Sequence, residues 1–534
     1  MHACVFADGL SKPRGVVIAD GGRGDLLVLE RGRARVVAIW DDDGDGVADG
    51  RATVFSKSKI NHGLAVYPDA ASAAPNRHVY ASSDTTVYRA PFGARQRTRS
   101  PTSSREVVIK NMNADGRGGA YMGHRTRTLV FGPDGKLYIS VGSKGNVDRD
   151  SHRSRIRRFT LADPLPSSGY DFQNGEVFAD GLRNEVGLAF DNFGVLWGVE
   201  NGADRLKRSD FGGDVHEDNP AEEFNRFPEA RVGDHWGYPY CWTSYQNSPA
   251  PPGPKGTVWA WPSFKGTHSD AWCQANTHPP ELAMQAHSAP LGLAFYGAEA
   301  ASAAEEDAES HTTCGDGPRG LPSEWRGDAV IPFHGSWNRD VPTGYKVVRV
   351  PMEIDTGLVS SSDDPVDLVW HRGTGARWPE GTRFVDAAFD ERGRLFVSSD
   401  GPDGAVALLH GGIVCGEGCT ECCRVGRGTM GAASYCASTC RCAHGEGDCD
   451  RSSHCVAGTS CVNNVGETYG FSRTTDVCET TPEPTRWPSR FPSKFPSQWP
   501  TTKYPSRFPT KVPSRYPTRW PTAWPSKFPS RRSG

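Results

Sequence analysis

The sequence predicts an all-β fold, and three observations support this class. Short apolar runs of β-branched and aromatic residues fill residues 1–412, and Gly, Asp or Pro turn signals close each run. Amphipathic helical patterns and heptads are almost absent. Aromatic content is 10%, which argues against a wholly disordered chain. The sequence contains no apolar run of about 18 residues, so it predicts no transmembrane segment.

The strands are expected to come in hairpins of one recurring form. Each copy consists of an apolar residue, a turn that contains Asp and Gly, and an apolar strand. The clearest copies begin at Phe131, Phe190 and Phe389. Each copy is typical of a β-hairpin that turns at its Gly. With weaker copies included, the first strands start near six positions: Pro13, His62, His124, Arg183, Pro290 and Arg383.

Such repetition, at intervals of roughly 50 to 100 residues, predicts a six-bladed β-propeller over residues 1–412, because radial repetition hides sheet edges. The long interval from Arg208 to Ala289 must hold an insertion. Cys241 and Cys273 lie inside it and could staple it as a disulfide loop.

A small disulfide-rich module is expected at residues 413–479, which hold eleven of the 15 Cys. A zinc knuckle is disfavoured, because His444 and His454 lack the usual spacing from the cysteines. Dense disulfides persist outside the reducing cytosol, so we expect an extracellular or cell-wall protein. The start MHACVFADGL lacks the basic and apolar regions of a secretion signal, so we expect a truncated start.

Residues 480–534 are expected to form a disordered, polyproline II-like tail. Proline recurs there about every four residues, followed by Ser or Thr, a cation and an aromatic residue. Eleven Lys and Arg face one acid, so this tail carries +10 and residues 1–479 carry −13. Cell-wall polysaccharide or a mineral matrix suits such a tail, and a glycosylated spacer is an equal alternative. Nucleic acid is not expected as a partner of an extracellular protein.

The propeller geometry predicts where function resides. The innermost strand of each blade lines the central channel, so residues just before the six starts should cluster at one mouth. A ring of imidazole and guanidinium groups there suits an anionic ligand beside a base. These positions hold His62, His124, Arg125, Arg127, Arg183, Asn184, His287 and Arg383.

Six stretches also carry a family resemblance. They are residues 124–138, 141–146, 181–190, 200–204, 334–339 with 344–348, and 383–390. In this order the chain resembles the soluble pyrroloquinoline-quinone (PQQ)-dependent sugar dehydrogenases of the glucose and sorbosone dehydrogenase superfamily. The sequence of these stretches resembles the sorbosone and fungal pyranose dehydrogenase branch more closely than it resembles bacterial soluble glucose dehydrogenase.

The resemblance implies roles for individual residues. It implies that His124 is the catalytic base, and that Ser143 stands where the bacterial enzyme has an Asp partner for this His. It implies PQQ as cofactor, bound by Arg183, Asn184 and Arg383, with His334 and Arg339 as looser matches. It implies Ca²⁺ held largely by backbone carbonyls, which map to Gly202 and Ala203, with Asp204 adjacent.

A second calcium site is predicted without the resemblance. Asp41, Asp43, Asp45 and Asp49 share one short loop with two Gly residues, and carboxylate oxygens are the ligands that calcium prefers. The twelfth position is Ala52 rather than Glu, so the loop is no EF-hand. The alternative is a solvated acidic turn.

Together these features predict a secreted quinoprotein oxidoreductase that oxidises a sugar or polyol and passes electrons to an external acceptor, a cytochrome or a quinone. The alternatives are a non-catalytic binding protein, similar to hedgehog-interacting proteins, or a matrix protein led by its tail. A binding protein has no reason to keep His124, Arg183, Asn184 and Arg383 together, so this combination favours the enzyme.

Overall fold

The computed structural model describes residues 2–410, except for gaps at 20–23, 69–76, 94, 113–122, 151, 247–250, 298–299, 303–319, 372–375 and 403, together with residues 459–463 and 477–480. The predictions for the module at 413–479 and the tail at 480–534 lie outside these residues, apart from the two short segments. Within the described part, no helix is long and apolar enough to cross a membrane.

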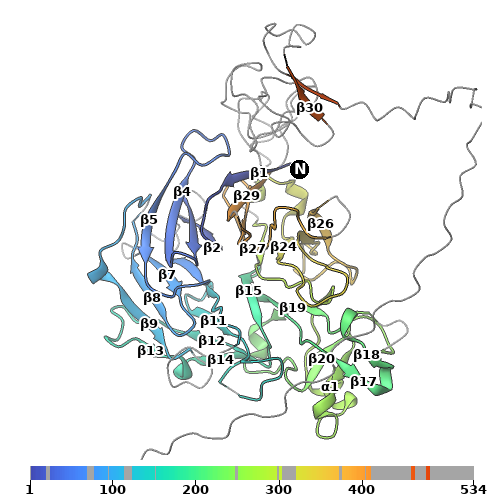
Figure 1. The fold of residues 1–534 in the computed structure, drawn as a ribbon. Coiled ribbons are helices and arrows are strands. Elements are labelled where there is room, and N and C mark those ends of the chain that lie inside the picture. Colours follow the sequence, from blue (N-terminus) through green and yellow to red (C-terminus); the bar gives the residue numbers. More distant parts are fainter. Residues whose placement is uncertain are drawn as a thin grey trace, which may run out of the picture. The chain divides into compact units, whose positions relative to one another are not determined.

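Six sheets, antiparallel except for one added edge strand, form the blades of a propeller, which confirms the predicted class (Figure 1). Each blade runs from an inner to an outer strand. The first is β2 (Pro13–Ile18), β3 (Leu26–Glu30), β4 (Arg35–Trp40) and β5 (Gly50–Ser56). The second is β6 (Leu64–Tyr67), β7 (His78–Ser82), β8 (Val87–Pro91) and β9 (Glu106–Lys110), with β13 (Tyr170–Asp171) parallel to β9. The third is β10 (Leu129–Phe131), β11 (Leu137–Val141), β12 (Arg155–Phe159) and β14 (Glu176–Asp180).

The remaining blades follow the same order. The fourth is β15 (Glu185–Phe190), β16 (Leu196–Glu200), β19 (Glu222–Phe227) and β22 (Leu282–Met284). The fifth is β23 (Ala294–Phe295), β24 (Ala329–Phe333), β25 (Lys346–Val350) and β26 (Val366–Val369). The sixth is β27 (Phe384–Phe389), β28 (Leu395–Ser399), β29 (Ala405–His410) and, from the other end of the chain, β1 (His2–Ala7). The inner strands begin within a few residues of the six predicted starts.

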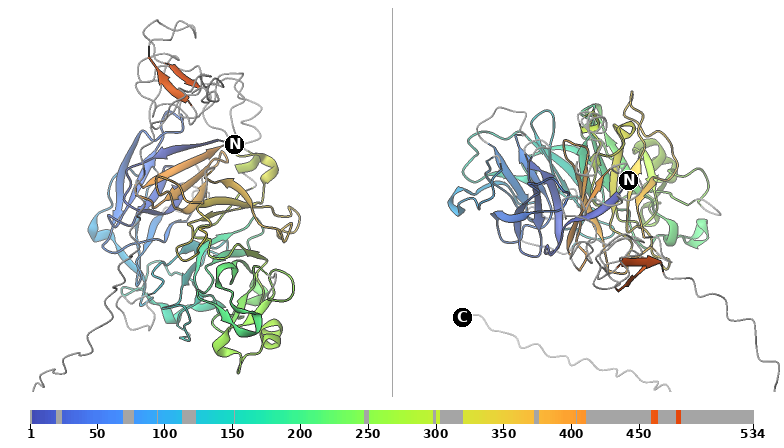
Figure 2. Two further views of the ribbon diagram at one scale, coloured as in Figure 1. Left: turned by 45° about the vertical axis from the view of Figure 1, so that its right-hand side comes forward. Right: turned by 90° about the horizontal axis from the view of Figure 1, so that it is seen from above.

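The ring is closed by strand β1, which pairs antiparallel with β29 as the outermost strand of the sixth blade. Figure 2 shows these first and last strands side by side. Phe6 packs edge-on against Phe396, and the two share a core cluster with Val28 and Ile39 of the first blade. Apolar side chains between neighbouring blades therefore form a continuous ring of cores.

A central channel with a volume of about 540 Å³ runs along the six inner strands. Its wall is apolar at Val17, Leu129, Leu188 and other positions, and His62, Thr128 and Asp386 add polar groups to it. The inner strands start at one mouth of this channel, and the second strand of each blade returns to it. The connections between first and second strands, and between third and fourth strands, lie at the opposite end.

The predicted insertion is present, but it is divided by strand β19. Its first part holds the hairpin β17 (Lys207–Arg208) and β18 (Gly213–Asp214). Its second part holds β20 (Cys241–Thr243), β21 (Val258–Ala260) and helix α1 (Asp270–Asn276). The predicted disulfide Cys241–Cys273 is confirmed and ties β20 to α1. The segment Glu222–Phe227 holds four polar or charged residues among six, which hid a blade strand inside what the sequence presented as one insertion.

A separate hairpin, β30 (Thr459–Val462) and β31 (Val477–Thr480), places Cys461 opposite Cys478. Both cysteines are disulfide-bonded, as is Cys4. The other nine cysteines of the 413–479 segment lie outside the described residues, so the disulfide module stays a prediction.

Candidate active site

The predicted base His124 lies just before β10, where the loop after β11 meets it at the channel mouth. Its Nδ1 is 3.0 Å from the Ser143 carbonyl oxygen and 3.1 Å from Ser143 Oγ. Ser143 Oγ donates its own proton to the Gly145 carbonyl at 2.7 Å. Both partners of Nδ1 are therefore acceptors, and we assign the ring proton to Nδ1. The lone pair then belongs to Nε2, which can accept a proton.

Burial and the nearby charge of Arg183 lower the pKa of His124 to about 3, although the hydrogen bond to the Ser143 backbone acts in the opposite direction. Ser143 is itself fully buried. An Asp at this position would favour the imidazolium, whereas Ser orients the ring without a charge. The substitution noted in the sequence therefore gives a neutral, oriented imidazole.

This low pKa predicts that His124 does not titrate near neutrality. In ¹³C-histidine NMR spectra of the full chain, the His124 resonance, assigned from a His124→Gln variant, should stay constant from about pH 5 to 8. The unfolded chain takes up this proton below its ordinary pKa and the folded chain does not, so the contribution of His124 to stability falls as the pH drops from 6.5 towards 3. A midpoint near 6.5 for this resonance would contradict the assignment.

Arg183, on the approach to β15, is 5% exposed and contacts three segments. Its guanidinium donates to the Asn201 carbonyl at 3.0 Å and also to the Gly202 carbonyl. It also bonds Asn146 Oδ1 at 3.1 Å and Asp204 Oδ2 at 3.0 Å. The backbone of Arg183 accepts from the Ser143 N–H at 2.7 Å. This residue therefore links the His124–Ser143 pair to the loop predicted to bind calcium.

Asn184, next to Arg183, is buried at the same strand start, and its Nδ2 lies 3.4 Å from Asn201 Oδ1. The structure thus brings the predicted Arg-Asn pair onto the loop that follows β16. Asn201 Nδ2 in turn donates to the Pro290 carbonyl at 2.7 Å. This contact ties the entry of the fifth blade to the same mouth.

The predicted calcium loop presents several oxygens. The Gly202 carbonyl and Asp204 Oδ2 both face Arg183, and Asp204 Oδ1 accepts from Asn338 Nδ2 at 2.7 Å. Ala203 lies buried between them. The Oδ1 atom of Asn338 is buried and has no hydrogen-bond partner among the described residues. Such an oxygen set fits a hard cation in kind, and a cation bound there would compete with Arg183 for two of these oxygens.

Two buried carboxyl groups support this loop, and the sequence reasoning assigned them no role. Glu200 Oε1 accepts from the Arg183 N–H at 2.7 Å. The Glu222 carboxyl accepts from the Gly202 N–H at 2.7 Å and from the Ala289 N–H at 3.1 Å. Burial raises the pKa of Glu222 to about 8, against the effect of these two donors. Glu200 stood in a motif used for the resemblance, whereas Glu222 gave no sequence signal.

The opposite side of the mouth is built around Asp400, which follows β28. Its Oδ1 lies 2.8 Å from His334 Nε2, and its Oδ2 lies 2.8 Å from Arg14 Nη1. Arg383 donates to the carbonyls of His334 at 3.1 Å and Gly335 at 2.8 Å. The structure therefore brings the predicted residues His334 and Arg383 together, and it adds Arg14 and Asp400, which the sequence analysis missed.

Arg339 lies differently from the other predicted cofactor ligands. It is 9% exposed in its side chain and pairs with Asp218 at 3.0 Å and Glu217 at 3.4 Å, both on the insertion. Its neighbour Asn338 is the residue that reaches Asp204. These contacts show Arg339 joining the loop after β24 to the insertion, and a contact with a cofactor stays a prediction.

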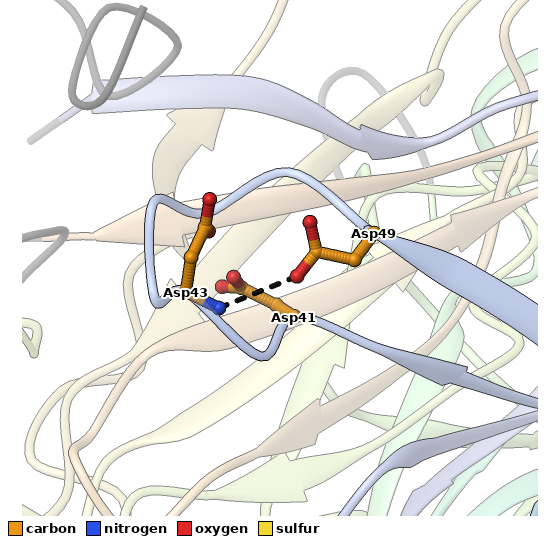
Figure 3. Close-up of side chains that lie close together, drawn as sticks. All are labelled: Asp41, Asp43 and Asp49. Atoms are coloured by element: carbon orange, nitrogen blue, oxygen red, sulfur yellow. Dashed lines mark hydrogen bonds between the residues drawn. The ribbon is translucent and has the colours of Figure 1, made fainter.

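The acidic loop lies between β4 and β5, at the end of the propeller opposite the mouth. Asp41, Asp43 and Asp49 each offer an oxygen within 4.8 Å of the others (Figure 3). Asp45 does not belong to this group. Its Oδ1 accepts from the Val47 N–H at 2.8 Å, and burial raises its pKa to about 6. Three of the four predicted ligands are therefore brought together.

If these three carboxylates bind calcium, replacing two of them should weaken stabilisation by the ion. Calcium at 100 times its dissociation constant adds about 2.7 kcal/mol to the folded state at one site. In scanning calorimetry of the full chain with EGTA or calcium, we expect Asp41→Asn combined with Asp49→Asn to lose part of the calcium-dependent rise in Tm. The matched control Asp45→Asn should retain it. An equal rise in all three proteins would contradict a site on this loop.

Fold and site together define a six-bladed propeller whose channel mouth carries an oriented neutral imidazole, buried guanidinium groups and an oxygen-rich loop. Within that class, the chain belongs to the TrAA12-like family, whose model matches residues 1–411. This match confirms the resemblance seen in the sequence.

Two curated relatives are similar over much of the chain. The pyrroloquinoline quinone-dependent pyranose dehydrogenase of Coprinopsis cinerea is 32% identical over 360 residues, which are 64% of this chain and 43% of the relative. The chain thus spans less than half of that relative. The pyrroloquinoline quinone-dependent sugar dehydrogenase of Hypocrea jecorina is 30% identical over 425 residues, 74% of this chain and 85% of the relative.

Solved structures agree with these relatives. The holo form of the pyranose dehydrogenase PQQ domain from Coprinopsis cinerea has a TM-score of 0.63 and 29% identity, over 77% of this chain and 95% of that one. The calcium structure of Trichoderma reesei Carbohydrate-Active Enzymes Family AA12 has a TM-score of 0.61 and 29% identity, over the same shares of the two chains.

Proposed function

We propose that the protein is a PQQ-dependent sugar dehydrogenase that oxidises the CH–OH group of a pyranose or related polyol. The His124–Ser143 pair carries the proposal, because it holds a neutral imidazole with its lone pair on Nε2 beside buried guanidinium groups. The names of the relatives support the cofactor and the substrate class.

The residues at the mouth fit the quinone in kind. PQQ carries three carboxylates, which bind best to guanidinium and amide donors. Arg183, Asn184 and Arg383 supply such donors, and His334 lies beside Arg383. The guanidinium groups of Arg183 and Arg383 already bond backbone carbonyls, so each is oriented before any ligand binds. Gly202 and Asp204 would hold Ca²⁺. When bound, the quinone supplies the acceptor for the hydride that leaves the carbinol carbon.

The chain's own residues supply the proton chemistry. His124 Nε2 takes the hydroxyl proton of the sugar, while Ser143 fixes Nδ1–H and hence the ring plane. The positive charge of Arg183, linked to Ser143 through its backbone, disfavours protonation of the free imidazole. The imidazole is therefore uncharged before substrate binds, and its Nε2 lone pair can accept the hydroxyl proton.

The wider setting is also a proposal. An external acceptor, either a cytochrome or a quinone, would reoxidise the cofactor. Dense cysteine supports an extracellular or cell-wall location, and the basic aromatic tail would hold the enzyme near polysaccharide or a mineral matrix. A non-catalytic binding protein is the second candidate, and the assembled His124, Arg183 and Arg383 argue against it.

The test is direct. The full chain is incubated with micromolar PQQ and calcium, and dye reduction is followed with a panel of aldoses and ketoses. We expect quinone uptake, seen in the absorption spectrum, and sugar-dependent dye reduction. If the protein takes up no quinone, the proposal is overturned. If it takes up quinone but turns over no sugar, the binding protein is favoured.

A further inference from the structure

Two large apolar side chains stand in solvent beside the polar mouth. Trp337 and Val341 are each 68% exposed, on the loop between β24 and β25. No other large apolar residue of the described part is as exposed. An exposed indole leaves apolar surface in water, a cost that usually marks a contact site when it sits beside a functional one.

The loop that carries Trp337 is firmly held. Ser336, directly before it, is 2% exposed and exchanges two hydrogen bonds with Thr343, at 2.9 and 3.0 Å. Tyr345 donates its hydroxyl proton to the Ser336 carbonyl. Arg339, two residues later, is anchored by Asp218. The backbone at Trp337 is thus fixed at both ends, and the exposure of the indole is built into the fold.

A second loop with an exposed apolar residue also contacts Asp204. Asn338 reaches Asp204 Oδ1 at 2.7 Å, and Asn146 accepts from the Asp204 N–H at 2.7 Å. Each of these Asn residues has an exposed apolar neighbour in sequence, Trp337 for the first and Val147, which is 37% exposed, for the second. Polar groups from two loops therefore converge on Asp204, and each loop carries an exposed apolar residue next in sequence to the Asn that makes the contact.

A pyranose ring has the complementary surface, because its C–H groups form apolar faces and its hydroxyls lie around the edge. Aromatic faces bind such apolar faces by stacking, and the polar groups between them bind hydroxyls. Trp337 is 68% exposed, whereas Arg183, which is linked through Asp204 to the neighbouring Asn338, is 5% exposed and lies further in. The exposed apolar residues at the channel mouth are therefore suited to a second sugar unit, outside the one that reacts.

We propose that Trp337, with Val341 and Val147, forms a stacking subsite for the sugar unit next to the one that is oxidised, so that oligosaccharides are better substrates than free monosaccharides. This inference rests on the proposed sugar dehydrogenase function and names its substrate class. Trp337 acts as a specificity-determining residue and takes no part in proton transfer.

Binding and turnover test the subsite separately. Calorimetric titration of the full chain with maltotetraose and cellotetraose needs no turnover, and Trp337→Ala should weaken the binding of one of them about 3- to 10-fold. Trp337→Phe should restore most of the affinity. The matched control Trp370→Ala removes an indole that is 47% exposed beyond the outer strand of the same blade, and it should bind like wild type. Melting curves verify that each variant folds.

In the loaded enzyme, Trp337→Ala should lower the ratio of kcat/KM for the tetrasaccharide to that for the monosaccharide by the same factor. Suppose that the enzyme turns over monosaccharides, but Trp337→Ala changes neither this ratio nor the calorimetric affinity. That result would overturn the subsite and leave the proposed function intact. Wild-type protein that binds neither tetrasaccharide would also overturn it. A change confined to the KM of a protein electron acceptor would assign Trp337 to that partner instead.

Discussion

Replacing His124 with alanine is expected to lower kcat for sugar oxidation by about 10²- to 10⁴-fold, because a positioned general base contributes a factor of this size. Quinone uptake should persist, since Arg183 and Arg383, rather than His124, are the proposed cofactor contacts. Stopped-flow reduction of the quinone by excess sugar measures the chemical step directly. Retention of more than a tenth of the wild-type rate would remove His124 from the mechanism.

Variants at Ser143 provide the matched comparison. Ser143→Ala removes one of the two acceptors at Nδ1 and keeps the backbone carbonyl, so its effect on kcat should be much smaller than that of His124→Ala. Ser143→Asp places a carboxylate beside Nδ1 and should raise the pKa of His124 from about 3. The activity of this variant should then fall at a higher pH on the acid side than that of wild type. Identical pH profiles would show that position 143 does not tune the base.

Replacing Arg183 with alanine should cost both stability and cofactor affinity. The change leaves Asp204 without its guanidinium partner and removes one donor each from the Asn201 carbonyl, the Gly202 carbonyl and Asn146 Oδ1. Breaking a buried ion pair from one side costs about 3 kcal/mol or more, and the partial exposure of Asp204 puts this case at the lower end. We expect a clearly lower Tm in calorimetry and loss of PQQ binding at micromolar concentration.

Two further variants separate these effects. Arg183→Lys keeps a charge near Asp204 but lacks the planar fork, so it should recover stability more than quinone affinity. Arg339→Ala breaks pairs with Glu217 and Asp218, which are partly exposed, and should affect quinone binding less than Arg183→Ala. Equal losses of quinone affinity in Arg339→Ala and Arg183→Ala would place Arg339 at the cofactor, as the sequence predicted. Full affinity in Arg183→Ala would contradict the assignment of Arg183.

Local sequence patterns were sufficient for the blades. An inner strand is a short apolar run bounded by turn signals, so the six starts could be found from residues close together in the chain. The partner of β1 could not be found in this way, because β1 pairs with β29 at the far end of the described propeller. Strand β19 escaped notice because Glu222 and Glu223 read as exposed, although Glu222 is buried and bonded to backbone N–H groups.

The site divides along similar lines. His124, Arg183 and Arg383 belong to motifs and were found through a resemblance. Arg14 and Asp400 lie 386 positions apart, and only the closure of the ring brings them together, so neither residue type nor spacing pointed to them. The role of Ser143 also could not be predicted from the sequence. Its hydroxyl accepts a hydrogen bond from His124 because its own proton is donated to the Gly145 carbonyl, and only the structure shows that contact.

The strand that closes the ring also sets the order of events during synthesis. Strand β1 is made before the other described blade strands, yet its partner β29 is made only after all the others. Until then β1 has no partner strand and the sixth blade is incomplete, and an open strand edge can pair with another chain. Nascent protein is therefore most prone to aggregate just before its last blade is complete, and slow, long-range pairing of β1 is the step that ends this exposure.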